Sequence, residues 1–263
     1  MKSFRILCFA AVCAAFPLAS CGSETAEESM QKSMTAAKEG KWEPALDEAR
    51  KAVKKAPGNT LANVLLAITL EKNNRPEEAL KAAKNASESD KSSFTAQYIL
   101  GRHYCRQQKY LDAIEPLTRA LELNPKDANT IILLAEAKIH LNNFEDAIRL
   151  YERLLDFPEF QDSSVLENEI GVLYVRKNDP NSAREHFSKA ISCEKDPENP
   201  ENPISYLNYA ILWDKYLTED PARKRITARA FYLKFLNCAA NRPTLATLCE
   251  EVNARLEKLD QQK

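Results

Sequence analysis

The chain has 263 residues, of which 44% are hydrophobic, so it is long enough to bury one large core or to form an array of repeats. It has only five glycines and is rich in Ala, Leu, Glu and Lys, a composition that favours an all-helical protein. The formal net charge of −1 excludes the strongly basic balance that is typical of nucleic-acid-binding proteins.

The first twenty residues predict a secretory signal. Lys2 and Arg5 precede an almost unbroken apolar run, which is too short for a lasting membrane span and ends in small residues. The run closes with Leu18-Ala19-Ser20-Cys21, which resembles a bacterial lipobox. That resemblance implies a lipoprotein signal peptide over residues 1–20 and lipidation of Cys21. An ordinary secretory signal with an incidental cysteine is the alternative.

Lipidation of Cys21 would place the protein in the cell envelope, because two or three acyl chains give stable anchoring to a membrane. Gly22 follows the cysteine where retention in the inner membrane would favour Asp. By resemblance to enteric bacteria, this implies the periplasmic face of the outer membrane if the cell has one. Residues 21–28 are then expected to comprise the lipidated cysteine and a short acidic tether of at most about 25 Å.

Small residues recur at a fixed interval along the rest of the chain. Ala45, Ala79, Ala113 and Ala147 are each 34 residues apart. Small side chains at such positions let two helices approach closely. The same register repeats on the preceding predicted helices, at Leu66-Ala67, Leu100-Gly101 and Leu134-Ala135. This helix–turn–helix period of 34 residues resembles the tetratricopeptide repeat.

The resemblance implies a right-handed α-solenoid built of antiparallel helix pairs. Successive units begin near residues 26, 60, 94 and 128, and a fifth follows with its landmark alanine at Ala183. Repeats one to five therefore span residues 26–197. Residues 198–263 are expected to form a divergent sixth helix pair, with its second helix at about 221–240, and a C-terminal capping helix at about 244–260.

The family generally binds its partners on a concave surface lined by the first helix of each repeat. Carrying these positions over by register gives eleven candidate groove residues, several of them aliphatic, which suggests an apolar peptide or helix as the ligand. They are Val64, Ile68, Tyr98, Arg102, Arg106, Ile132, Glu136, Ile139, Asn168, Val172 and Arg176. The arginines are suited to pairing with carboxylates. Alternatively, the groove closes partly on itself or packs on the final helices.

Signatures of enzymes are absent from the sequence, which has no glycine-rich phosphate loop, no HExxH and no GxSxG motif. We expect no catalytic residue, no cofactor, no metal site, no small-molecule substrate and no nucleic-acid partner. Cys238 and Cys249 lie on either side of a predicted turn, and an exported protein permits a disulfide there. The sequence leaves open whether these two cysteines pair or stay free.

Arg223, Lys224, Arg225 and Arg229 form a basic cluster on the predicted helix at about 221–240. It is interpreted either as a solvated helix face or as a contact for anionic lipid headgroups or an acidic partner.

The leading hypothesis is a non-enzymatic, membrane-anchored scaffold that binds a protein partner in its groove and assists assembly of an envelope complex. The arrangement is similar to that of type IV pilus pilotins. The two-residue insertion before the fifth repeat, followed by Val165-Leu166-Glu167-Asn168 ahead of Ile170-Gly171, also resembles theirs. The β-barrel assembly lipoprotein and the repeat lipoproteins that adapt peptidoglycan hydrolases share the arrangement too. The alternative is an accessory component of a cell-wall or carbohydrate-processing enzyme system.

Overall fold

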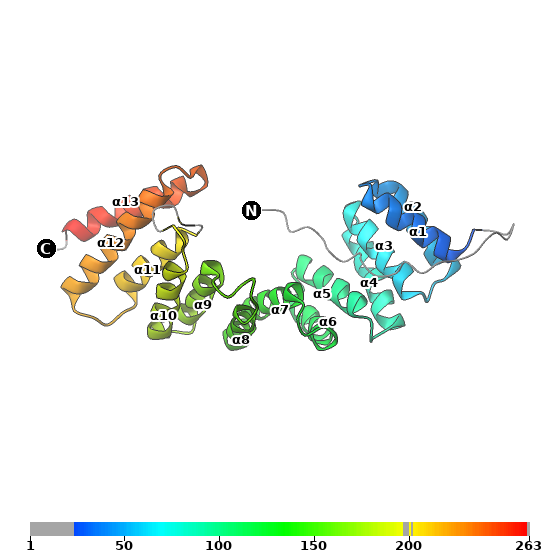
Figure 1. The fold of residues 1–263 in the computed structure, drawn as a ribbon, viewed down its shortest axis with the longest axis horizontal. Coiled ribbons are helices and arrows are strands. Elements are labelled where there is room, and N and C mark those ends of the chain that lie inside the picture. The colour runs from blue at the N-terminus through cyan, green and yellow to red at the C-terminus, as the bar shows by residue number, and fades with distance from the viewer. Residues whose placement is uncertain (1–23, 197–199, 201, 262–263) are drawn as a thin grey trace.

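The structure is a computed structural model and describes residues 24–196, 200 and 202–261. The predicted signal peptide and Cys21 lie outside the described residues. The described part contains thirteen α-helices, a short 3-10 helix and no strand. The helices stack in chain order into an elongated arch, with α1 and α2 at one end and α12 and α13 at the other (Figure 1). The predicted all-α solenoid is confirmed.

Consecutive helices form antiparallel pairs at the predicted period. The first five pairs are α1 (Ala26–Lys38) and α2 (Trp42–Lys55), α3 (Thr60–Lys72) and α4 (Pro76–Ser89), α5 (Phe94–Arg106) and α6 (Tyr110–Leu123), α7 (Ala128–His140) and α8 (Phe144–Leu155), and α9 (Ser164–Arg176) and α10 (Pro180–Ser192). The first helices of repeats two to four thus begin at residues 60, 94 and 128, where the sequence period put them.

Side-chain caps fix the start of each of these first helices. Thr25, Asn59, Ser93, Asp127 and Ser163 each accept a hydrogen bond from the backbone N–H three residues later. Such a cap satisfies one of the free N–H groups at a helix start and is typically worth about 1 kcal/mol. The capping residues follow the same 34-residue spacing, with two extra residues before Ser163.

The turn inside each of the first five pairs also has a constant backbone conformation. Gly40, Asn74, Gln108, Asn142 and Asn178 all have a positive φ, between 56° and 75°. Residues in this left-handed region end a helix and reverse the chain, and Gly and Asn adopt it most easily. Of these five residues, Gln108 is the one that is neither Gly nor Asn.

Close approach of the paired helices explains the periodic small residues. Ala45, Ala79, Ala113 and Ala147 are fully buried. A Cβ atom on Gly101 in α5 would lie only 2.5 Å from Leu117 Cγ in α6. The sequence interpretation of these residues as packing positions is confirmed, because a larger side chain would push the paired helices apart.

The sixth pair and the final helices differ from the regular repeats. They comprise α11 (Ile204–Lys215), α12 (Pro221–Ala239), the 3-10 helix η1 (Pro243–Leu245) and α13 (Ala246–Gln261). Val252, Leu256 and Leu259 of α13 are buried in the same core as Tyr232 and Phe235 of α12. A helix in the predicted capping position therefore covers the end of the array. Cys238 and Cys249 are not joined by a disulfide.

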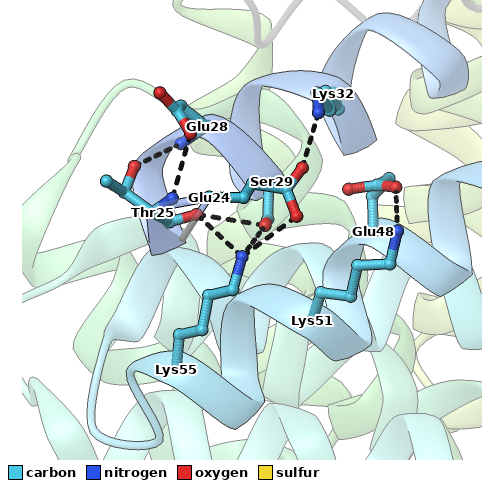
Figure 2. Close-up of polar contacts among 8 residues, drawn as sticks. All are labelled: Glu24, Thr25, Glu28, Ser29, Lys32, Glu48, Lys51 and Lys55. Atoms are coloured by element: carbon cyan, nitrogen blue, oxygen red, sulfur yellow. Dashed lines mark hydrogen bonds and ion pairs between the residues drawn. The ribbon is translucent and has the colours of Figure 1, made fainter. Parts of the chain in front are cut away.

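The N-terminal end of the array is held by ion pairs (Figure 2). Glu24 accepts hydrogen bonds from Lys32 Nζ at 2.6 Å and from Lys55 Nζ at 3.0 Å. Thr25 and Glu28 form a capping box, in which each side chain accepts a hydrogen bond from the other residue's backbone N–H. Residues 26–28 of the predicted tether therefore belong to α1, and the chain is already fixed at Glu24.

Across the described ranges, every helix is either too short or too polar to cross a membrane.

Candidate partner-binding site

An open cavity of about 340 Å³ lies between α5 and α7, the first helices of repeats three and four. Its wall combines an aromatic ring, aliphatic side chains, an amide and charged groups. The lining residues are Tyr98, Arg102, Cys105, Arg106, Asn129, Ile132, Leu133 and Glu136. We call this cavity the α5–α7 groove.

Five of the eleven predicted groove residues line this cavity together. They are Tyr98, Arg102, Arg106, Ile132 and Glu136. Helical periodicity accounts for their convergence, because residues four apart lie on one face of a helix. Of the other three lining residues, Cys105 and Asn129 also occupy groove positions of the repeat register, whereas Leu133, adjacent to Ile132, does not.

The two arginines of the α5–α7 groove are paired within the protein itself. Glu71 of α3, whose side chain is only 10% exposed, accepts a hydrogen bond from Arg102 Nη2 at 2.9 Å. Arg106 forms an ion pair with the other carboxylate oxygen of Glu71. The sequence left both arginines available for a ligand's carboxylate, and this expectation needs correction. The preceding repeat supplies this carboxylate, because its first helix, α3, lies beside α5.

The ring of Tyr98 is held in place by residues on the same helix. It stacks on Phe94 with 5.9 Å between ring centroids, and the guanidinium of Arg102 lies 5.8 Å from its centroid. These contacts lie at i, i+4 spacing along α5, which brings side chains onto one face. The groove therefore offers a fixed aromatic ring beside a cation, and neither has to be ordered by a ligand.

Burial suppresses ionisation of the titratable groups around the groove. Burial, reinforced by the positive charge of Arg102, lowers the pKa of His103 to about 4. Burial raises the pKa of Cys105 to about 12, and the nearby charge of Glu136 adds to this effect. Near neutral pH the thiol and the imidazole are therefore uncharged, so Cys105 is no activated nucleophile.

The remaining predicted residues do not join this cavity. Val64 is 3% exposed and Asn168 is 2% exposed, so both belong to the interior and not to an open surface. The amide of Asn208 in α11 donates to Asn168 Oδ1 at 2.9 Å. These two predictions are wrong because each first helix packs against the next first helix, which covers positions that a single repeat would expose.

Four other predicted residues lie at the margins of the cores or on the surface. Ile68, Ile139 and Val172 are half-buried and pack on the hydrophobic cores between repeats. Arg176 is exposed, and its guanidinium lies 4.3 Å from the centroid of the Phe144 ring. It is thus separate from the Arg102–Arg106 pair with which the sequence grouped it.

A second hollow lies beside α9 and the end of α10, and no sequence pattern pointed to it. It includes Glu167, Cys193 and Glu194. Glu167 is buried and lies 2.7 Å from Nδ1 of His186. Burial raises the pKa of the Cys193 thiol. Within the described residues, no group of three or more His, Cys, Asp or Glu side chains is arranged to hold a metal ion.

Comparison with known families decides the nature of the repeats. Residues 30–86, 64–128 and 105–159 match tetratricopeptide-repeat families. The chain carries tetratricopeptide repeats. The matched segments overlap and together run from α1 into the loop after α8, so they include both helices that line the α5–α7 groove.

Solved tetratricopeptide structures share the arrangement of the helices. The MamA crystal structure is 25% identical with a TM-score of 0.60, and the match covers 66% of this chain and 94% of that one. Pseudomonas aeruginosa pilF is 18% identical with a TM-score of 0.59, over 88% of this chain and 97% of that one. YrrB, described as a TPR protein with an unusual peptide-binding site, is 18% identical with a TM-score of 0.60, and the match covers 77% of this chain and 97% of that one. No curated protein sequence matches this chain.

Proposed function

We propose that this tetratricopeptide protein is a lipid-anchored, non-catalytic scaffold of the bacterial cell envelope that binds a partner peptide or helix in the α5–α7 groove. The observation that carries the proposal is the open cavity between two first helices, with an aromatic ring, an aliphatic side chain and a half-exposed arginine in its wall. Such a mixture suits a peptide whose apolar side chain sits beside a polar or acidic group.

Pre-ordering of the wall favours binding. Arg102 and Arg106 are held by Glu71, and Tyr98 is held by Phe94 and Arg102. Groups that are already fixed lose little conformational entropy when a ligand arrives, which strengthens binding. The described peptide-binding site of YrrB is consistent with a peptide ligand for this chain, although the likeness between the two proteins concerns the fold.

The proposed membrane anchor rests on the Leu18-Ala19-Ser20-Cys21 motif after an apolar run. The fixed position of Glu24 adds a physical consequence, because it lies only three residues after Cys21, a step that spans at most about 11 Å. An acylated Cys21 would therefore keep the first repeat next to the bilayer. Assistance in assembling an envelope complex, as in pilotins, is the role that we propose for this arrangement at the outer membrane.

The test of the groove uses affinity capture from detergent-solubilised membranes with two tryptophan variants. Asn129→Trp places a bulky side chain in the cavity, whereas Asn85→Trp changes an exposed asparagine on α4 and serves as the matched control. The parent protein and the control should recover one envelope protein in stoichiometric amount, and Asn129→Trp should lose it. Equal recovery by both variants, or no recovery by the parent, would refute the groove.

The test of the anchor is fractionation of cells that produce the Cys21→Ser variant. We expect the parent protein in the membrane fraction with an acylated N-terminus by mass spectrometry. The variant should lack the acyl chains and shift away from that fraction under high salt. An unacylated parent protein would refute the anchor without touching the groove.

A further inference from the structure

The outward side of α12 has an unusual combination of exposed apolar and basic side chains. Ile226 is 66% exposed and Leu233 is 36% exposed, and they lie seven residues apart, which is two turns of the helix. The exposed Ala230 lies between them. The opposite side of the helix is buried through Ala228, Tyr232 and Phe235, so this strip is a separate outward face.

Basic side chains border the strip on both sides. On a helix of 3.6 residues per turn, Arg229 lies on one flank of Ile226 and Leu233, while Arg223 and Lys234 lie on the other. All three are exposed. The whole of α12 contains five basic residues and no acidic residue, in a chain whose formal net charge is −1. Positive charge is thus concentrated on this helix.

The neighbouring carboxylates leave these basic groups able to bind another anion. Arg229 pairs with Asp260 at 3.0 Å and Arg223 pairs with Glu219 at 3.4 Å. The arginine side chains of both pairs are about half exposed or more. Exposed pairs of this kind are weak and exchange readily for another partner. The Lys234 ammonium lies 5.6 Å from the ring centroids of Tyr206 and Phe231, on the side of the strip that faces α11.

We propose that this face of α12 binds the surface of a membrane rich in anionic lipids. Two large apolar side chains are too few for the core of a stable protein–protein interface, which typically buries about 800 Å² on each partner. They are sufficient to enter the boundary between headgroups and acyl chains while long basic side chains contact the phosphates. The charge of the face is complementary to such a surface.

The position of α12 gives this contact a consequence for the whole array. The helix lies at the end of the arch opposite α1, near which the acyl chains of the proposed anchor would be attached (Figure 1). Two attachments at opposite ends make the second one intramolecular, so that even a weak contact becomes highly occupied. The array would then lie along the membrane surface. This orientation rests on the proposed anchor, whereas the contact between α12 and lipid does not.

The experiment measures co-sedimentation with vesicles of phosphatidylcholine alone and of phosphatidylcholine mixed with phosphatidylglycerol. It uses the unacylated chain from residue 22 onward, which contains every described residue, so that a failure of the anchor cannot affect the outcome. We expect binding to the anionic vesicles only, and a marked loss of binding as the salt concentration rises.

Two double variants test the two parts of the face. Ile226→Ser with Leu233→Ser should weaken binding roughly ten-fold or more, because both apolar side chains lose their burial. Arg229→Gln with Lys234→Gln should weaken it by a similar factor, since each basic residue near an anionic surface contributes roughly five-fold. The matched controls are Leu111→Ser, at a side chain that is 74% exposed on α6, and Lys81→Gln with Lys84→Gln on α4. Neither control should change binding.

Three outcomes would overturn the proposal. The first is equal binding to neutral and anionic vesicles. The second is unchanged binding by both α12 variants, with circular dichroism showing that they are folded. The third is that the protein binds neither kind of vesicle but binds an acidic protein through this face of α12. That result would assign the surface to a protein partner.

Discussion

The guanidinium of Arg102 donates a hydrogen bond to Glu71 Oε2 over 2.9 Å, and this contact joins the third repeat to the second. The same carboxylate pairs with Arg106 and lies 3.4 Å from Nδ1 of His103. Because the Glu71 side chain is only 10% exposed, it acts both as a joint between repeats and as the buried counter-ion of two arginines that line the α5–α7 groove.

Glu71→Gln should therefore lower stability and change the preference of the groove for ligands. Removing the charge leaves two guanidinium groups facing a neutral amide, which should cost about 1–3 kcal/mol of unfolding free energy. The freed arginines should also bind acidic peptides more tightly. Urea unfolding and peptide titration measure the two effects. The matched control Glu136→Gln alters an exposed carboxylate of the same cavity and should stay within about 0.5 kcal/mol. Equal effects of the two changes would contradict this view of Glu71.

An added methyl group at Gly101 should destabilise the protein, because the side chain of Leu117 already occupies the space that the methyl group would need. A Cβ atom there would lie 2.5 Å from Leu117 Cγ and 2.6 Å from Leu117 Cδ2. We expect Gly101→Ala to cost about 1–2 kcal/mol, since overpacking outweighs the better helix propensity of Ala. Gly58→Ala is the matched control, because no atom lies within 4 Å of its Cβ position. Denaturant unfolding of both variants decides the matter, and an unchanged midpoint for Gly101→Ala would contradict the close-packing interpretation.

Glu24 should make the N-terminal end of the array sensitive to acid. Hydrogen bonds from Lys32 and then Lys55 lower the pKa of Glu24 to about 2 from its ordinary 4.5 (Figure 2). The folded protein favours the charged carboxylate, so its contribution to stability is present above about pH 4.5 and is lost between pH 4.5 and 2. Hydrogen exchange of the first turn of α1 should therefore quicken over this range.

The control for that prediction is built into the same helix end. Glu24→Gln should exchange fast at all these pH values, whereas Glu27→Gln removes an exposed carboxylate nearby and should behave like the parent protein. Added salt should reduce the difference between parent and Glu24→Gln, because exposed ion pairs are screened. A parent protein whose first turn exchanges at a constant rate from pH 5 to pH 2.5, after correction for intrinsic chemistry, would contradict the role of Glu24.

Much of the fold was predictable because it depends on local, periodic features. The 34-residue spacing of Ala45, Ala79, Ala113 and Ala147 set the register of the first four helix pairs. Pro221 and Pro243 marked the starts of the last elements, since proline suits the first turn of a helix. Capping residues such as Asn59 and Asp127 were also readable at the same spacing, yet the alanine pattern alone did not point to them.

The candidate site was less predictable because it depends on contacts between repeats. The register identified Tyr98, Arg102 and Ile132 as neighbours in the groove, since it reports the face of a helix. It did not reveal that stacking of the next helix buries Val64, or that Glu71 pairs with two arginines that lie 31 and 35 residues later in the chain. Such facts depend on tertiary geometry that no local pattern contains.

The ion pair between Asp214 and Arg255 should hold the capping helix on the array. Asp214 of α11 is 4% exposed at its side chain and accepts from Arg255 Nε at 2.7 Å and Nη2 at 2.6 Å. The hydroxyl of Tyr232 in α12 donates to the same carboxylate at 3.1 Å. Three helices therefore meet at one charge, and a paired fork of this kind is among the stronger hydrogen-bonding arrangements.

Asp214→Asn should release α13 before the rest of the array unfolds. We expect a loss of about 2–3 kcal/mol, because the amide matches neither the charge nor both acceptor positions of the carboxylate. Asp260→Asn is the matched control, since Asp260 joins the same two final helices through an exposed pair with Arg229 and should cost less than about 1 kcal/mol. Hydrogen exchange should show fast exchange confined to α13 in Asp214→Asn, together with early proteolysis near η1. If α13 is equally protected from hydrogen exchange in both variants, the buried charge is not what holds the capping helix. The buried side chains of Val252, Leu256 and Leu259 would then hold it without the ion pair.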